Sequence, residues 1–347
     1  MRHILYFLFA VIAMAACKHR PLEEFNHMKY VKVYFDENIR NVNFGLYDDT
    51  KPNTEYQSPK AVRVTLADKK SGKVLYSRHL THHGCDERGN YVDGYVMVKP
   101  GSYHLLAYNY DTKSDHVLNE NSYYDMEVYT NSLDENTRNR YLAMLQSSRG
   151  FNPDELRYEP EHFFVASQQD VTVRATSEND TLSTAHAKHF TAESVVKTYY
   201  MQVNVKGVEH VRTATALITG MSGAIKLHNR QMVENKPASV FFGLQNGENK
   251  AKTNDGVRVG YAYFNTFGKL PNVEGYIEIA FEFKTHYNTV QTEVIRVTDM
   301  FDTEQVKDKQ WIIIDKVIEI TPPDGGSGGG LSPGVNLWEQ IESGFTI

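Results

Sequence analysis

Apolar and polar residues alternate with a two-residue period along much of the chain. Residues 30–35 and 62–66 each place a valine, leucine or phenylalanine at every second position. This period is typical of half-buried β-strands. The segment 69–73 (KKSGK) predicts a turn before a strand at 74–77, so we expect a hairpin. Pro100-Gly101 predicts a further turn before a strand at 103–110.

One segment departs from the two-residue period and predicts a helix. Ser132 and Glu135 have the spacing of a capping box, and Gly150 provides a stop. The apolar stripe between them consists of Leu133, Tyr141, Leu142 and Leu145. We expect a short helical connection that packs across the edge or end of a sheet.

A second set of strands follows the polar stretch 175–183 (ATSENDTLS), which is the best candidate domain boundary. These strands are expected at 201–205, 213–219, 240–244, 257–264, 276–284 and 311–320. In the fifth, Glu278 and Glu282 are expected on a solvent-facing side, opposite the apolar positions. Two successive sets of strands predict an all-β chain with two β-sandwiches, at residues 30–178 and 179–323.

The first residues have the layout of a bacterial lipoprotein signal peptide. Arg2 precedes an apolar run at 4–13, and the run ends in Met14-Ala15-Ala16-Cys17. This ending resembles the lipobox of signal peptidase II, so residues 1–16 are expected to be removed and Cys17 to be lipidated. The alternative is an ordinary signal peptide in which Cys17 falls at this place by chance. Residues 17–29 are then a tether, in which Glu23 and Glu24 resemble a surface-export signal or form a plain solvated linker.

The composition narrows the classes of function. Net charge is −6, and basic residues are interspersed with acidic ones, so no nucleic-acid partner is expected. With 22 Tyr and 17 Phe, the composition favours strands. Of the two cysteines, Cys17 is assigned to lipid, which leaves Cys85 without an intramolecular partner. No disulfide framework is therefore expected, and stability has to come from packed cores.

Clusters of metal-ligand residue types occur, but none predicts a site. The close group consists of His79, His82, His83, Cys85 and Asp86. Because closed zinc sites usually take ligand pairs from two places, we interpret this group as a polar hairpin tip. His186 and His189 are interpreted as part of a solvated loop. No nucleophile-elbow, zincin or phosphate-loop motif is present. We expect no metal, no cofactor and no enzymatic activity.

The C-terminal segment combines flexibility with apolar residues. The run 325–330 (GGSGGG) is a flexible linker, and residues 331–347 (LSPGVNLWEQIESGFTI) follow it. The apolar side chains Val335, Leu337, Trp338, Ile341 and Phe345 are candidates for binding a partner by adding a strand to a sheet edge. The alternative is that the segment folds back on its own sandwich, which is favoured because an unpaired apolar strand promotes aggregation.

A three-residue motif lies in the expected boundary region. Asp180-Thr181-Leu182 resembles the D-S/T-aliphatic motif at which bacteria of the Bacteroidales type O-glycosylate exported proteins. Thr181 is therefore a candidate glycosylation site.

Taken in order, four segments resemble the fimbrillin-associated anchor lipoproteins of Bacteroidales, the FimB-type members of the fimbrillin superfamily. They are 17–22 (CKHRPL), 98–108 (VKPGSYHLLAY), 217–223 (LITGMSG) and the glycine-rich linker that precedes a Trp-containing strand. The resemblance spans nearly the whole chain. It implies two tandem transthyretin-like sandwiches of Greek-key type. It also implies a lipid-anchored place at the outer membrane, facing the cell exterior, with fimbrial shaft subunits as partners through β-strand contact.

Two functions from different classes follow. The first is an anchor or accessory subunit of a fimbria, tethered to the outer membrane through Cys17. The alternative is a glycan-binding surface lipoprotein of a nutrient-uptake system, which would need exposed aromatic platforms. Tyrosine is abundant, but there are only two tryptophans, Trp311 in an expected core strand and Trp338 in the C-terminal segment.

Overall fold

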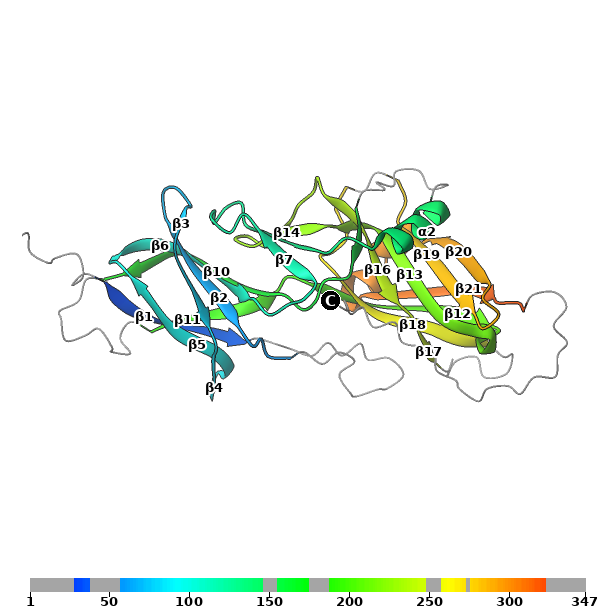
Figure 1. Cartoon of the computed structure of the whole chain (residues 1–347), viewed down its shortest axis with the longest axis horizontal. Helices are drawn as coiled ribbons and strands as arrows, with labels where there is room; N and C mark the ends of the chain where they lie inside the picture. Colours follow the sequence, from blue (N-terminus) through cyan, green and yellow to red (C-terminus); the bar gives the residue numbers. More distant parts are fainter. Residues whose placement is uncertain are drawn as a thin grey trace, which may run out of the picture.

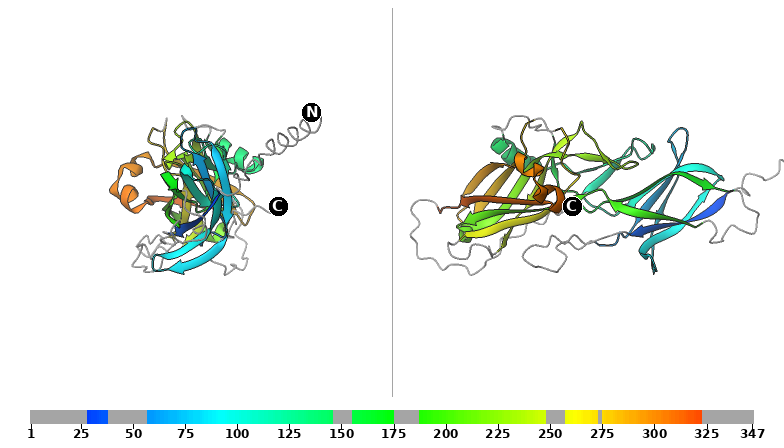
Figure 2. Two further views of the ribbon diagram at one scale, coloured as in Figure 1. Left: turned by 90° about the vertical axis from the view of Figure 1, so that its left-hand side faces the viewer. Right: turned by 180° about the vertical axis from the view of Figure 1, so that it is seen from behind.

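The chain is an elongated all-β protein in which two sandwiches lie end to end (Figure 1). The computed structural model describes residues 28–37, 57–145, 155–174, 187–247, 257–272 and 275–322. Views from the end and from behind show the same arrangement (Figure 2). None of the helices within these ranges has the length and hydrophobicity needed to cross a membrane.

The first sandwich is built from eight strands in the order β3-β2-β6-β10-β11-β1-β5-β4. The expected two-residue alternation is confirmed in β1, where Val31, Val33 and Phe35 point into the core. The expected hairpin is confirmed by the pairing of β2 with β3. The strands are β1 (Lys29–Glu37), β2 (Val62–Asp68), β3 (Val74–Leu80), β4 (His82–Asp86), β5 (Gly89–Val98), β6 (Gly101–Asn109), β10 (Phe164–Val173) and β11 (Lys188–Ser194).

The chain passes from one layer of this sandwich to the other at two places. β3 pairs with β2 and, after Thr81 alone, β4 pairs with β5. At the opposite side, β11 pairs in parallel with β1 and then antiparallel with β10. Strands that switch layers in this way form the corners of a sandwich. Both sides of the first sandwich are therefore bridged by continuous chain.

A small four-stranded sheet joins the two sandwiches. β8 (Glu127–Thr130) lies between β7 (Asp115–Leu118) and β14 (Ala224–Lys226), and β15 (Gln231–Met232) completes the sheet. It covers an outer face of the first sandwich through an apolar cluster that includes Leu106, Tyr108, Val165, Met126, Val128, Ile225 and Leu227. Because this sheet takes strands from both halves of the chain, it couples them.

The second sandwich has a four-stranded and a five-stranded sheet, in the orders β17-β18-β12-β21 and β20-β19-β13-β16-β9. At its centre the rings of Phe242 and Phe264 stack with centroids 4.1 Å apart. The strands are β9 (Leu156–Tyr158), β12 (Lys197–Lys206), β13 (Val211–Ser222), β16 (Pro237–Gly243), β17 (Gln245–Gly247), β18 (Val257–Thr266), β19 (Glu278–Thr285), β20 (Val290–Arg296) and β21 (Trp311–Glu319). The short helices η4 (Val208–His210), η5 (Thr298–Asp302) and α3 (Glu304–Lys309) lie in its connections.

Strand pairing does not follow a single division of the chain near residue 178. β9, which precedes that position, pairs in parallel with β16 of the second sandwich. β11, which follows it, completes the first sandwich. The chain therefore passes between the sandwiches several times, and a cut at residue 178 would remove a strand from each.

The expected helix is α2 (Glu135–Leu145), but its start and its location differ from the prediction. Asp134, and not Ser132, accepts the hydrogen bond from the Thr137 N–H at 3.0 Å. The helix covers the outer face of the five-stranded sheet, where Tyr141 and Leu145 pack with Leu217 and Ala280. The expectation that the helix packs across the edge or end of a sheet is therefore wrong.

The helix also explains why the face of β19 that was predicted to be exposed to solvent is buried. Glu278 and Glu282 do lie opposite the core side chains of β19, as their alternation indicates. Both are nevertheless buried, and Arg140 of α2 forms an ion pair with Glu282. A helix on this face removes the solvent that the alternation predicted.

Candidate functional site

The residues singled out for function in the sequence lie outside the described ranges. These are the lipidation site Cys17, the glycosylation candidate Thr181 and the C-terminal partner-binding candidates Val335, Leu337, Trp338, Ile341 and Phe345. Their roles remain predictions, and the structure contributes other surfaces.

The clearest of these surfaces is a groove between two open strand edges of the second sandwich. β20 ends one sheet and β21 ends the other, and within the described chain each pairs with a neighbour on one side only. A depression of about 280 Å³ lies between them, lined by Phe283 and by residues 291–293 and 316–320. Side chains bridge it. Lys316 pairs with Glu293, and the Gln291 amide donates to the Thr321 hydroxyl at 3.1 Å.

This groove offers what an added strand requires. An edge strand presents backbone N–H and C=O groups that can pair with another chain. Val317, which is 43% exposed, gives the groove apolar surface. The sequence pattern did not predict β20, because its segment (VQTEVIR) is largely polar and lacks a strong two-residue hydrophobic period. Its pattern of partial burial is that of an edge.

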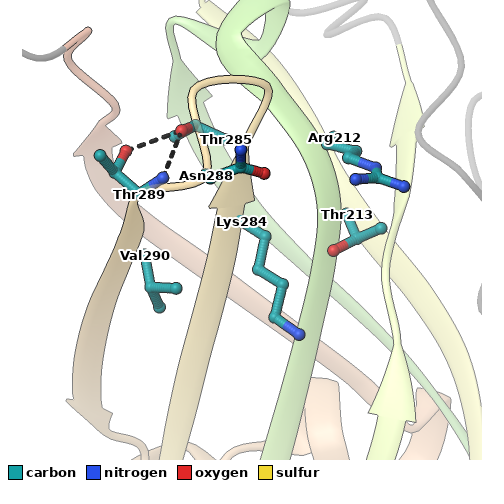
Figure 3. A pocket seen from close by; sticks show the side chains of 7 residues that line it. All are labelled: Arg212, Thr213, Lys284, Thr285, Asn288, Thr289 and Val290. Atoms are coloured by element: carbon teal, nitrogen blue, oxygen red, sulfur yellow. Dashed lines mark hydrogen bonds between the residues drawn. The ribbon is translucent and has the colours of Figure 1, made fainter.

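A second depression lies next to the groove, around the turn that joins β19 to β20 (Figure 3). It measures about 420 Å³, and its lining includes Arg212, Lys284 and Asn288. The turn is held by the Thr285 hydroxyl, which contacts the Thr289 hydroxyl at 2.7 Å and accepts from the Thr289 N–H at 3.2 Å. Asn288 has a φ of +59°, as a tight turn requires. Two cationic side chains give this depression a basic character.

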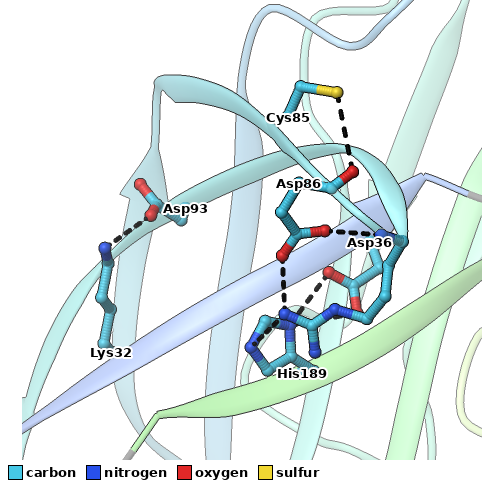
Figure 4. A network of polar contacts seen from close by, with 7 residues as sticks. Lys32, Asp36, Cys85, Asp86, Asp93 and His189 are labelled. Carbon is cyan, nitrogen blue, oxygen red and sulfur yellow. Dashed lines mark hydrogen bonds and ion pairs between the residues drawn. The ribbon is translucent and has the colours of Figure 1, made fainter. Parts of the chain in front are cut away.

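A polar network covers the outer face of β1, β4, β5 and β11 in the first sandwich (Figure 4). The buried carboxylate of Asp93 lies 2.9 Å from the Lys32 ammonium and 2.6 Å from His82 Nδ1. The hydrogen bond to Asp93 raises the pKa of Lys32 above its ordinary value. Two cationic or donor groups around one carboxylate tie β1 and β4 to β5.

His189 forms the other half of the network. The Arg88 guanidinium donates to His189 Nε2 at 3.0 Å, so the proton of the imidazole lies on Nδ1, which donates to Asp36 at 3.1 Å. The imidazole also stacks on Tyr34 with centroids 4.1 Å apart. Arg88 donates to Asp86 at 2.7 Å and lowers the pKa of that carboxyl. These contacts fix the layer-switching strand β11 to β1 and to the β4–β5 turn.

The histidine and cysteine cluster is divided by the strand geometry. Alternation along β4 places His82 and Asp86 on the face of the polar network, and places His83 and Cys85 on the other face. His79 lies in β3 and stacks on Tyr110. Within the described ranges, no three His, Cys, Asp or Glu side chains gather as metal ligands would.

Trp311 lies in β21, a strand that contributes to the core as expected, but its side chain points away from the core. It belongs to an aromatic cluster on the outer face of the four-stranded sheet, together with Tyr200, Tyr261 and Tyr263. The tyrosine rings are mutually tilted, with interplanar angles of 31°, 46° and 77°. Alternation placed the large side chains on one face of β21 or the other, but it did not show which face was the core.

Comparison with known proteins agrees with the resemblance found in the sequence. Over 315 residues, the chain is 25% identical to a curated Bacteroides ovatus protein named "Putative fimbrium anchoring subunit Fim4B", covering 81% of this chain and 83% of that protein. A crystal structure from Bacteroides ovatus ATCC 8483, described as a "putative adhesin", matches with a TM-score of 0.55 at 22% identity, covering 89% of this chain and 98% of that one. The fimbrial anchor protein Mfa2 from Porphyromonas gingivalis aligns with a TM-score of 0.43 at 12% identity, covering 84% and 92%.

A match to a family model shows to which protein family the chain belongs. The model described as "Domain of unknown function (DUF5119)" matches residues 54–243, which is more than half of the 347 residues. The matched region runs from the first sandwich through the joining sheet into β16. The chain therefore belongs to the DUF5119 family, and the expected similarity to fimbrial anchor proteins is confirmed.

Proposed function

We propose that this protein is an anchor or accessory subunit of a fimbria. The observation that carries the proposal is the similarity to a fimbrium anchoring subunit, which extends over 81% of this chain and 83% of that protein. A match over nearly the whole of both chains includes both sandwiches and the sheet that joins them. The role is mechanical and requires no catalytic residues.

The proposed attachment of the protein to the membrane rests on the N-terminal sequence. We infer that Cys17 carries lipid, that the tether 17–29 connects it to β1, and that the protein sits at the outer membrane facing the exterior. Two or three acyl chains would hold it stably, whereas one holds only marginally. We further infer that both sandwiches are of the transthyretin-like type.

An anchor must also bind a shaft subunit, and the groove between β20 and β21 is our candidate for this contact. A strand from the partner would pair with the open edge of either sheet and place alternate side chains against Val317. The apolar residues of 331–347 are a second candidate contact. Load would then pass from the second sandwich through the joining sheet and the first sandwich to the lipid.

Substitution of each of the two cysteines in turn tests the lipid anchor. Cys17→Ala should abolish incorporation of labelled palmitate and release both the protein and its fimbriae into the medium. Cys85→Ala is the matched control, because Cys85 is exposed, unpaired and the only other cysteine. Fimbriae that stay on cells carrying Cys17→Ala would contradict the anchoring role.

Charge placed at the groove tests the shaft contact. Val317→Lys puts an ammonium where a strand would pack, and should reduce co-purification of the shaft subunit with this protein. Leu75→Lys is the control, because Leu75 is 48% exposed on β3 of the first sandwich. Equal recovery of the shaft subunit with Val317→Lys and with Leu75→Lys would exclude the groove. Deletion of residues 331–347 tests the second candidate contact in the same assay.

The glycan-binding alternative finds no support in the aromatic cluster. A sugar ring stacks on a flat aromatic platform, whereas Tyr261 and Tyr263 lie edge to face at 77°.

A further inference from the structure

The outer face of β1 and β5 in the first sandwich carries three large apolar side chains that are exposed to solvent. Tyr30 is 44% exposed, Tyr95 46% and Met97 49%. In the antiparallel register Tyr30 lies opposite Met97, and Tyr95 is the next outward residue of β5. Because directly opposite side chains on one face start about 5 Å apart, the three residues form one apolar patch. Grouped exposed apolar residues mark contact surfaces, whereas single ones need no explanation.

This face changes character along β1. Beyond the apolar patch, the next outward positions bring in carboxylates, Asp93 on β5 and then Asp36 on β1, which belong to the polar network (Figure 4). At the levels of the patch itself, the charged outward residue of β1 and β5 is Lys32, opposite Tyr95. Exposed Lys99 follows β5 directly after the patch. The apolar patch is therefore bordered by cations, and the carboxylates lie on the other half of the face.

The apolar patch lies where the chain leads back towards Cys17. Tyr30 is the second residue of β1, and β1 begins at the end of the molecule far from the second sandwich (Figure 1). Lys29, the first residue of β1, is 12 positions after Cys17, a stretch that spans roughly 40 Å when fully extended. A lipid on Cys17 would thus keep the patch near a bilayer at all times. Because such a tether gives a high effective concentration, even a weak contact would be populated.

We propose that the apolar patch lies on the surface of the bilayer, beside the lipid of Cys17. The inference rests on the proposed lipid anchor. Tyrosine is enriched at membrane–water interfaces, because its ring is apolar and its hydroxyl is polar. Met97 adds an apolar side chain at the same level as Tyr30. Lysines such as Lys99 place a long apolar stem at the interface and an ammonium among anionic headgroups, which attract it.

A second contact beside the lipid restricts how the protein stands on the membrane. A lipid on a tether leaves the attached domain free to rotate, whereas a patch on the bilayer fixes the face that is turned towards it. The patch ends where the carboxylates of Asp93 and Asp36 begin, and an anionic surface repels these groups. Contact is therefore confined to one end of the elongated molecule. The second sandwich, with the groove between β20 and β21, then stays accessible to a shaft subunit.

Attachment of the purified protein to vesicles tests the contact. Residues 17–347 with Cys85→Ala have Cys17 as their only thiol, which can be coupled to a maleimide lipid in vesicles of phosphatidylcholine and phosphatidylglycerol. Tyr95→Trp then reports on the patch through quenching by bromine-labelled acyl chains. Tyr287→Trp is the matched control, because Tyr287 is 50% exposed and lies on the second sandwich. The protein without either substitution supplies the background emission, which is subtracted.

We expect strong quenching and a blue shift for Tyr95→Trp, and little of either for Tyr287→Trp. Met97→Glu in the Tyr95→Trp protein should abolish the quenching, because it places a carboxylate in the patch. Val317→Glu, at a position of similar exposure on the second sandwich, should leave the quenching unchanged. Equal quenching of Tyr95→Trp and Tyr287→Trp would overturn the proposal. A blue shift of Tyr95→Trp without vesicles, either on dimer formation or on addition of polysaccharide, would also overturn it, since the patch would then bind a second copy or a glycan.

The experiment separates the patch from the lipid anchor. Chemical coupling holds Cys17 at the bilayer whether or not cells attach lipid to it. Absence of quenching would therefore refute the contact and leave the anchor standing. Absence of labelled palmitate from the protein in cells would refute the anchor, and with it the place of the patch beside a lipid.

Discussion

Removal of Arg140 should destabilise the second sandwich by much more than removal of a surface cation. The guanidinium Nε of Arg140 on α2 donates to both carboxylate oxygens of Glu282, at 2.9 and 3.2 Å. The Glu282 side chain is only 3% exposed. Breaking a buried ion pair by removing one partner costs about 3–5 kcal/mol, because the remaining charge stays buried. Lys284 lies 3.8 Å from the same carboxylate, and Arg140 is 37% exposed, so we expect about 2–3 kcal/mol for Arg140→Met.

The measurement is urea-induced unfolding in the Trp338→Phe background, where Trp311 alone reports on the second sandwich. Arg140→Met combined with Glu282→Gln should regain much of the loss, since the double variant leaves no buried charge. The control is Lys206→Met at the Lys206–Glu319 pair, whose side chains are 51% and 59% exposed, so that its loss should have little effect on stability. If Arg140→Met and Lys206→Met cost the same, the burial argument for Glu282 is refuted.

Two further predictions concern the pH dependence and the backbone. Desolvation raises the pKa of Glu159 to about 7, although its carboxylate accepts a hydrogen bond from the Asn265 N–H. Because the folded state favours the protonated form, stability should be highest below the ordinary pKa of about 4.5 and fall as the pH rises to 7; Glu159→Gln should remove this fall in melting curves at pH 5 and 8. Gly207 has a φ of +81°, and an added Cβ would clash with the carbonyl oxygen of Ile320. Gly207→Ala should therefore lower the free energy of unfolding by about 1–3 kcal/mol, and by more than Gly89→Ala, where the φ is also positive but the space is open.

Hydrophobic alternation determined most of the strands and the all-β class. The two-residue period located β1, the β2–β3 hairpin and β12, and its interruption located α2. These predictions succeed because alternation is a local property of a half-buried strand. The N-terminal lipobox is local in the same sense, and its prediction concerns a residue outside the described chain. Weakly patterned elements were missed, as the polar segment of β20 shows.

Only the tertiary structure decided which strands are neighbours and which faces are covered. The alternation in β19 separates Glu282 from the core phenylalanines, but α2 packs on the face that carries Glu282 and buries it. Likewise Trp311 was placed in a strand, while the partners of β21 decided that it points away from the core. The exchange of β9 and β11 between sandwiches depends on pairings between distant residues. A two-residue period fixes that side chains alternate, but long-range packing fixes which side is the inside, and no local pattern contains that information.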